Sequence, residues 1–262
     1  MYSQELKITK QAALEAGELL RKEFLRWKRG GAKYKKHMEL VTWVDKKAEA
    51  IILTKLKKHF PQYAILSEES GLQDMPSDYS WVIDPLDGTT NFTIHHPLFA
   101  TSISLVYKNE VVMAVSYLPI LKEIYWAIQG KGAYKGNKKI YVSNKKILRE
   151  SIISYNYGQG RINTNKSFKI FKHFQRAALK CLNFHCTSMQ TAMVAAGHID
   201  GYIVSGAKIW DVAAGMLFIK EAGGVVTDWK NKPWNKKSTT ILAGNQTMHK
   251  IYLRELKKIR LA

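Results

Sequence analysis

The segment WVIDPLDGTTNF, residues 81–92, restricts the possible folds of this chain more than any other. Its apolar run Trp81–Ile83 predicts a buried strand. That run ends in Asp84, and Asp87 follows three residues later. Charge beside a buried strand is costly unless a cation compensates it. The chain has only 21 Asp and Glu against 41 Lys and Arg, so two acids at this point indicate a functional site.

The first half of the chain predicts two helices followed by short strands. Apolar residues at helical spacing predict an amphipathic helix over 4–28. A Gly- and Lys-rich loop, a candidate flap, follows at 30–40. The helix over 41–60 has Thr42 and Asp45 in a capping-box pattern at its start. Short β runs come next, including a hairpin that turns at Lys108-Asn109. This half reads as α+β with antiparallel pairing.

From about residue 150 the pattern changes to strands that alternate with helices, which is typical of α/β layers. We therefore expect two parts, residues 1–145 with most of the candidate acids and residues 146–262 with Asp211. No linker marks the boundary, and no internal repeat is visible.

The candidate acids all follow strands or open helices. Glu68 and Glu69 follow a predicted strand, and Asp211 opens the helix that begins near residue 210. Such positions line crevices in layered folds, so we expect these acids to converge with Asp84 and Asp87. Taken singly, each has an ordinary alternative as a turn or capping residue. Taken together, the acids supply hard carboxylate oxygens, which are ligands that Mg²⁺ prefers. The backbone amides after Asp87 can face a phosphate.

These motifs resemble the inositol monophosphatase family. The resemblance rests on WVIDPLDGTTNF, on EES at 68–70 and on WDVAAGMLFIKEAGG at 210–224, and it extends over nearly the whole chain. It implies a layered αβαβα sandwich of the inositol monophosphatase and fructose-1,6-bisphosphatase type, usually dimeric. It also implies Mg²⁺-dependent, commonly Li⁺-sensitive hydrolysis of phosphate monoesters by in-line attack of metal-activated water.

Roles follow from the resemblance position by position. Two or three Mg²⁺ per site would be held by Glu68, Asp84, the Leu86 carbonyl, Asp87 and Asp211. Asp45 and Thr89 would orient the attacking water, because a threonine hydroxyl can relay a proton to a carboxylate. The Gly88 and Thr89 amides would hold the phosphate. The substrate pocket would include Ser188, Met189, Gln190 and Val204.

Three departures from the family pattern concern the substrate. Glu39 replaces an Asp near the flap, Thr187–Gln190 replaces Gly-Ser-Ala-Ala, and Val204 replaces a Glu that binds sugar hydroxyls. A valine accepts no hydrogen bond, and sites that read hydroxyls discriminate steeply. Inositol 1-phosphate remains the default substrate. Fructose 1,6-bisphosphate, histidinol phosphate and nucleotide phosphates stay open.

The net charge of +20 keeps a second class of function open. A strongly basic chain attracts RNA, and some bacterial members of the resembled family associate with transcription complexes. The basic residues crowd into segments 21–36, 131–149 and 161–176 and contain no nucleic-acid-binding motif, which favours a solvated basic surface. A catalytically inactive homologue is disfavoured, because Asp84, Asp87 and Asp211 are all present.

The cellular setting is expected to be cytoplasmic. No apolar run approaches the roughly 18 residues that span a bilayer, and the charged N-terminus is unlike a signal peptide. Cys181 and Cys186 are the only cysteines, and such a pair is expected to be reduced.

Overall fold

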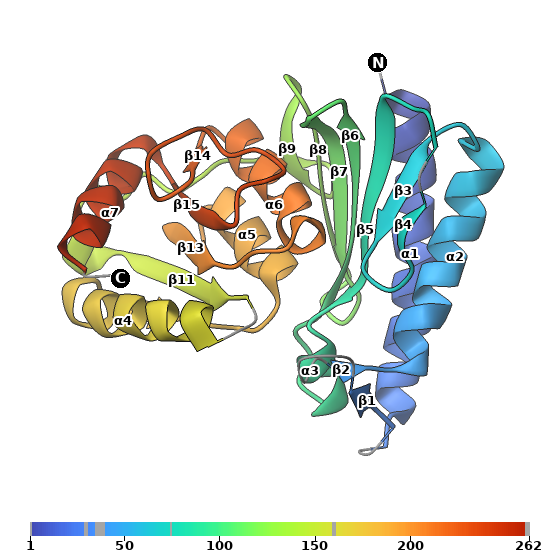
Figure 1. Ribbon diagram of the computed structural model, residues 1–262, viewed down its shortest axis with the longest axis horizontal. Coiled ribbons are helices and arrows are strands. Elements are labelled where there is room, and N and C mark those ends of the chain that lie inside the picture. Colours follow the sequence, from blue (N-terminus) through green and yellow to red (C-terminus); the bar gives the residue numbers. More distant parts are fainter. Residues whose placement is uncertain (1, 29–30, 35–39, 74, 159–160, 260–262) are drawn as a thin grey trace.

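A computed structural model describes the chain except residues 1, 29–30, 35–39, 74, 159–160 and 260–262. Helices and sheets alternate in five layers, so the predicted αβαβα sandwich is confirmed (Figure 1). Helices α1 (Ser3–Arg26) and α2 (Trp43–His59) cover one face of an eight-stranded sheet. The other face packs on α5 (Thr187–Ala195) and α6 (Ile209–Glu221). A five-stranded sheet follows, covered by α4 (Arg161–Ala177) and α7 (Gln246–Lys258).

The eight-stranded sheet has the order β10-β9-β8-β7-β6-β5-β3-β4 and is antiparallel except where β3 pairs with β5. Its central strands are β5 (Tyr79–Asp87), β6 (Ala100–Tyr107), β7 (Glu110–Leu118) and β8 (Glu123–Ile128). At its edges lie β3 (Ala64–Ser67), β4 (Gly71–Gln73), β9 (Gly132–Lys135) and β10 (Lys138–Ile140). The predicted hairpin at Lys108-Asn109 joins β6 to β7. The sequence patterns did not indicate β9 and β10, which have four and three residues.

The expectation that a strand stops at Asp84 is wrong, because β5 continues to Asp87. Pro85 has no amide hydrogen, but the register of the β5–β6 pair shifts between Asp84 and Asp87. A bulge of this kind accommodates a proline without breaking the strand. The Pro85 carbonyl is used instead, accepting a hydrogen bond from Thr101 Oγ1 at 3.0 Å.

The five-stranded sheet is mixed, with the order β12-β11-β13-β15-β14. Its strands are β11 (Ile152–Tyr157), β12 (Lys180–Leu182), β13 (Gly201–Ser205), β14 (Val225–Thr227) and β15 (Thr240–Gly244). The neighbours of β11 run parallel to it, as crossover helices require, whereas β15 is antiparallel to both of its neighbours. β12 has three residues and was not predicted.

Smaller elements complete the fold. The short pair β1 (Lys33–Tyr34) and β2 (Leu40–Val41) flanks α2, α3 (Thr89–Thr93) follows β5, and a 3₁₀ turn spans Leu148–Glu150. Cys181 and Cys186 are both free thiols. Within the described residues, no helix has the length and apolar character needed to cross a membrane.

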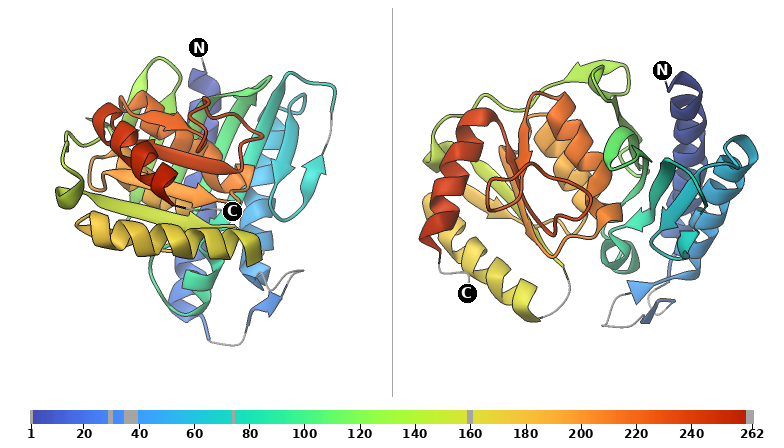
Figure 2. Two further views of the ribbon diagram at one scale, coloured as in Figure 1. Left: turned by 60° about the vertical axis from the view of Figure 1, so that its left-hand side comes forward. Right: turned by 45° about the horizontal axis from the view of Figure 1, so that its top comes forward.

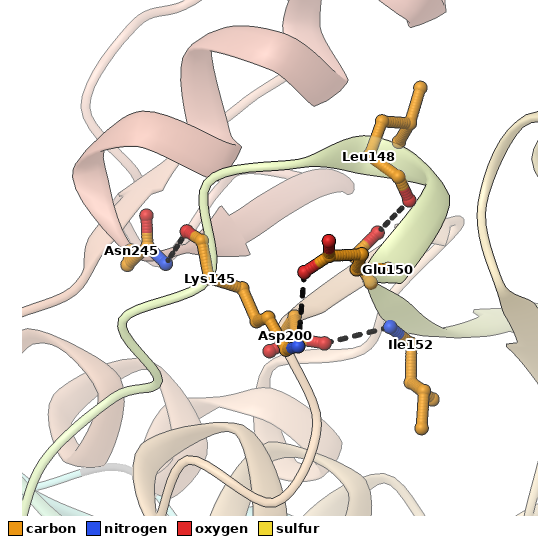
Figure 3. Close-up of polar contacts among 7 residues, drawn as sticks. Lys145, Leu148, Glu150, Ile152, Asp200 and Asn245 are labelled. Atoms are coloured by element: carbon orange, nitrogen blue, oxygen red, sulfur yellow. Dashed lines mark hydrogen bonds and ion pairs between the residues drawn. The ribbon is translucent and has the colours of Figure 1, made fainter.

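The segment between the two sheets is held by polar contacts to the second half (Figure 3). Asn245, the N-cap of α7, donates from Nδ2 to the Lys145 carbonyl at 2.8 Å. The Ile152 amide, at the start of β11, donates to Asp200 Oδ2 at 2.7 Å. These contacts set how the chain enters β11. The division into residues 1–145 and 146–262 stays a prediction.

Candidate functional site

The bulge in β5 turns both of its acids to one face of the sheet. Asp84 lies opposite Ser102 and Asp87 opposite Ala100, so three residues of β5 match two of β6. Without the extra residue, side chains three apart would point to opposite faces. Val82 and Ala100 belong to the apolar core beneath α5 and α6, so the shared face is the one turned to these helices.

Asp84 is 1% exposed and lies among other acids. Burial, followed by the negative charges of Glu68, Asp87 and Asp211, raises the pKa of Asp84 well above its ordinary value of 3.8. A hydrogen bond with the Glu68 side chain acts in the same direction. Two carboxyl groups share such a bond only when one holds a proton. The local chemistry therefore calls for a proton or a cation at this point.

Asp87 joins the two halves of the molecule. Its Oδ2 accepts a hydrogen bond from the Ser188 amide at the start of α5 and lies 3.5 Å from Cys186 Sγ. Burial raises the pKa of Asp87, although hydrogen bonds from Ser188 and Thr187 act in the opposite direction. The residue after it, Gly88, has φ +92°, and a Cβ there would lie 3.0 Å from the Leu98 carbonyl. Glycine is needed for this turn into α3.

Asp45 has two roles, one on each carboxylate oxygen. Oδ2 accepts from the amide and hydroxyl of Thr42, at 2.8 and 2.5 Å, which completes the predicted capping box. Oδ1 accepts from Thr89 Oγ1 at 3.0 Å, across 44 residues of sequence. Burial raises the pKa of Asp45, while the bonds from Thr42 and Thr89 oppose the rise. The capping and relay interpretations, posed as alternatives, are both compatible with this geometry.

Glu68 lies in the turn that follows β3, and its amide donates to the Ile83 carbonyl at 3.1 Å. Glu49 supports this turn from α2. One of its carboxylate oxygens accepts from both the amide and the hydroxyl of Ser70, each at 3.1 Å. We had not singled out Glu49 from the sequence. Its signal was the i, i+4 spacing from Asp45, which places both acids on one face of α2.

Asp211 lies in the first turn of α6, whose N-cap is Lys208, so Asp211 is not the cap residue. The approach of α6 to α5 depends on Gly215, where a Cβ would lie 2.0 Å from Thr191 Oγ1. The start of α6 lies near the other acids, because the negative charge of Asp211 acts on Asp84.

The predicted substrate residues lie mostly in the core. Met189, Gln190 and Val204 are at most 3% exposed. Gln190 donates to the Tyr155 carbonyl at 3.0 Å and to Ser154 Oγ, so its amide group is directed at β11. A direct role of these three side chains in substrate binding stays a prediction. Glu39 lies outside the described residues.

Asn156 is a polar neighbour of this region that we had not singled out from the sequence. It lies beside Val204 in the β11–β13 pair, and its Nδ2 donates to Thr187 Oγ1 at 2.8 Å. The alternation of polar and apolar residues in the predicted strand offered no means of telling it from an ordinary edge residue.

Across the described part of the chain, no three His, Cys, Asp or Glu side chains already form a metal-binding group. The acids near Asp84 are nevertheless close enough to shift its pKa. Their oxygen-only donor set fits Mg²⁺, and a cation would offset the repulsion that keeps like charges apart.

Comparisons with known proteins identify the family and the fold. The model of the inositol monophosphatase family matches residues 1–261. A fructose-1,6-bisphosphatase/inositol-1-monophosphatase of Aquifex aeolicus is 34% identical over 254 residues, covering 97% of this chain and 95% of the relative. The Nus factor SuhB of Escherichia coli K12 is 36% identical over 261 residues, covering 96% and 95%. The crystal structure of extragenic suppressor protein suhB from Bartonella henselae superimposes with a TM-score of 0.91 at 32% identity, covering 98% and 99%.

Proposed function

The chain belongs to the inositol monophosphatase family, and on that premise we propose that it is a Mg²⁺-dependent hydrolase of small phosphate monoesters. Membership implies a phosphatase, and the family is generally metal-dependent. The observation that carries the proposal is the pairing of two features at the end of β5. Asp84 is buried among acids, and Thr89 donates to Asp45.

In this proposal the carboxylates of the first half and of α6 hold the metal. Its ligands would be Glu68, Asp84, the Leu86 carbonyl, Asp87 and Asp211, binding two or three ions. When bound, Mg²⁺ supplies a Lewis acid that polarises the phosphate and lowers the pKa of water. The hydrogen bonds from Ser188 to Asp87 and from Leu86 to Asp84 hold these two carboxylates in place.

The remaining residues move a proton. Thr89 Oγ1 donates a hydrogen bond to Asp45 Oδ1. The lone pairs of the same hydroxyl oxygen stay available to accept a hydrogen bond from an attacking water. As that water attacks, its proton passes to Thr89 and the Thr89 proton passes to Asp45. Burial raises the pKa of Asp45, and a more basic carboxylate accepts the proton more readily. Thr42 keeps Asp45 oriented throughout.

For the substrate, we propose inositol 1-phosphate or a related sugar or alcohol phosphate, with its phosphate at the Gly88 and Thr89 amides. The relatives leave the alcohol open, because the Aquifex protein is named for both fructose 1,6-bisphosphate and inositol 1-phosphate. Val204 is an apolar core residue and has no group to bind a sugar hydroxyl.

The test is phosphate release from a panel of monoesters, with Mg²⁺ and with EDTA. The panel contains inositol 1-phosphate, fructose 1,6-bisphosphate, histidinol phosphate, NADP and AMP. We expect Mg²⁺-dependent turnover of at least one ester and none in EDTA. Turnover that persists in EDTA contradicts the metal assignment. No turnover of any ester, with Mg²⁺ bound, contradicts the proposal.

A second candidate function is RNA association within a transcription complex. Two observations favour it: the net charge of +20 and the similarity to proteins named Nus factor SuhB. Specific binding predicts saturation at a defined stoichiometry and retained discrimination among RNAs as salt is raised. Weak binding of every polyanion, lost at moderate salt, would indicate a basic surface alone.

We also propose the homodimer that the family resemblance implies. Light scattering coupled to size-exclusion chromatography tests it directly. A molar mass near twice the 29.9 kDa of one chain is expected, and a monomer at all concentrations contradicts it.

A further inference from the structure

The outermost helical layer contains a cluster of cations that the phosphatase proposal does not use. α4 and α7 lie on the face of the five-stranded sheet that is turned away from α5 and α6 (Figure 1 and Figure 2). Their inner faces form a separate apolar core that includes Phe174 and Tyr252. The acids of the candidate site lie on the other side of this sheet, so the cluster is distinct from that site.

A pocket of about 530 Å³ lies where the C-terminal ends of α4 and α7 meet. Its basic lining residues are Lys169, Lys172, His173, Arg176 and Lys258. Ala177 and Ile259 add apolar surface, and the described lining contains no acid. The pocket is open to solvent on its outer side.

The cations of α4 share one face by sequence spacing. Lys169, Lys172 and Arg176 follow one another at i, i+3 and i+7, which aligns their side chains along the helix. All three are exposed. On an isolated helix this would be a solvated stripe, but here α7 lies beside it and adds Lys258 to the same open pocket.

The charge balance of the pocket is positive. Glu255 accepts from His173 Nε2 at 2.8 Å and from Lys258 Nζ at 2.5 Å. Each helix C-terminus adds the equivalent of about half a negative charge. Lys169, Lys172, Arg176 and Lys258 line the pocket, and Glu255, which contacts Lys258, lies beside it. Basic side chains therefore outnumber the carboxylate at this pocket, which favours an anionic ligand.

We propose that this pocket binds a small phosphate-bearing anion, either inorganic phosphate or the phosphate of a nucleotide. Arg176 offers the planar fork that binds phosphate oxygens in pairs, and the lysines act as point charges. An RNA backbone instead needs cations spread along a track, because its charge is distributed over successive phosphates. Here the cations of α4 border a single pocket together with Lys258 of α7.

The other outer layer provides a matched control. Lys57 and Lys58 occupy the last turn of α2, and both are exposed, as Lys172 and Arg176 are on α4. The pocket that Lys58 lines contains an acid, Glu15, which lies 2.5 Å from Lys55 Nζ. Replacing two lysines there lowers the net charge by the same two units without touching the proposed site.

The experiment is calorimetric titration with AMP and with inorganic phosphate, in EDTA at low ionic strength so that Mg²⁺ contributes nothing. We expect one site in the wild type and at least tenfold weaker binding in Lys172→Gln/Arg176→Gln. Affinity should be unchanged in Lys57→Gln/Lys58→Gln. Tighter binding of AMP identifies a nucleotide as the occupant, and equal binding identifies the phosphate alone.

Three outcomes overturn the proposal. If the wild-type protein binds neither anion, the cations are only solvent-exposed surface residues. Equal weakening in both double variants shows a diffuse electrostatic field. Binding of a short RNA that the α4 substitutions abolish, without binding of either small anion, assigns the pocket to RNA. Phosphate release with Mg²⁺ is measured on the same variants, so failure here leaves the phosphatase proposal standing.

Discussion

The carboxylates around Asp84 form one cluster of like charges, and the cations between α4 and α7 form another. The two clusters differ in how deeply they are buried. Asp84 and Asp87 are at most 8% exposed, whereas Lys169, Lys172 and Arg176 are exposed. Buried like charges repel strongly, since little water screens them. Exposed charges repel weakly and are screened by salt over about 8–10 Å. The acids therefore need a cation to be tolerated as charges, whereas the basic pocket is stable without a ligand.

The largest effect is expected where the acids are most buried. Asp84→Asn should lower turnover on the order of a thousandfold, the scale seen for loss of a preorganised electrostatic group. It should also raise the melting temperature of the metal-free protein. Because the folded-state pKa of Asp84 is raised, its stabilising contribution is present below about pH 3.8 and is lost as pH rises through the folded pKa. At neutral pH the Asp84 carboxyl therefore costs stability in the metal-free protein, and asparagine, which does not titrate, removes that cost.

Steady-state kinetics and thermal melts in EDTA check both parts of this prediction. Asp78→Asn is the matched control, because Asp78 is exposed just before β5. Substantial activity with normal Mg²⁺ dependence in Asp84→Asn would contradict the metal assignment.

A second prediction separates proton transfer from metal binding within the acidic site. Thr89→Ala should lower kcat by about a hundredfold, the low end for a lost acid–base group. The Mg²⁺-induced rise in melting temperature should stay close to that of wild type, because Thr89 supplies no carboxylate. Thr89→Ser keeps the hydroxyl that donates to Asp45 and should recover most of the activity. An unchanged kcat in Thr89→Ala would remove the residue from the mechanism.

Mg²⁺ itself should stabilise the acidic site and not the basic pocket. At a hundred times its dissociation constant, a ligand of the folded state adds about 2.7 kcal/mol. That corresponds to a rise in melting temperature of several degrees for a chain of this size. The rise should be absent in Asp84→Asn and unchanged in Lys172→Gln/Arg176→Gln. Thermal melts across a Mg²⁺ titration measure it, and an equal rise in all three proteins would indicate nonspecific binding.

The smallest predicted effect is on the pH dependence of stability, through a buried histidine whose charged form is disfavoured by burial. His249, on the inner face of α7, is buried and lies 2.8 Å from Thr227 Oγ1 through Nε2. Burial lowers the pKa of His249 below its ordinary value of 6.5. A depressed folded pKa gives stability that is present above pH 6.5 and lost as pH falls through the folded pKa.

Melting temperatures from pH 7.5 to 5 should therefore fall by a few degrees at most through this group. The fall in melting temperature per pH unit should be smaller in His249→Gln, which keeps a polar group near Thr227. His59→Gln is the control, because His59 is an exposed residue at the end of α2. A pH slope that His249→Gln leaves unaltered would show that other groups are responsible.

The local chemistry of this protein could be predicted from its sequence. Periodicity indicated α1 and α2, the hairpin at Lys108-Asn109 and the alternation of the second half. The capping box at Thr42 and Asp45 followed from two residue types three apart. These features depend on neighbours within one or two turns of chain, so local propensity and patterning decide them.

Only the tertiary structure decided which distant groups meet. The bulge in β5 places Asp84 and Asp87 on one face, and its register is set by pairing with β6. Thr89 reaches Asp45 across 44 residues, and Ser188 reaches Asp87 across 101. The cations of α4 share a pocket with Lys258 only because α7 packs beside α4. Contacts of this kind depend on how whole layers pack, which hydrophobic burial drives without leaving a local signature in the chain.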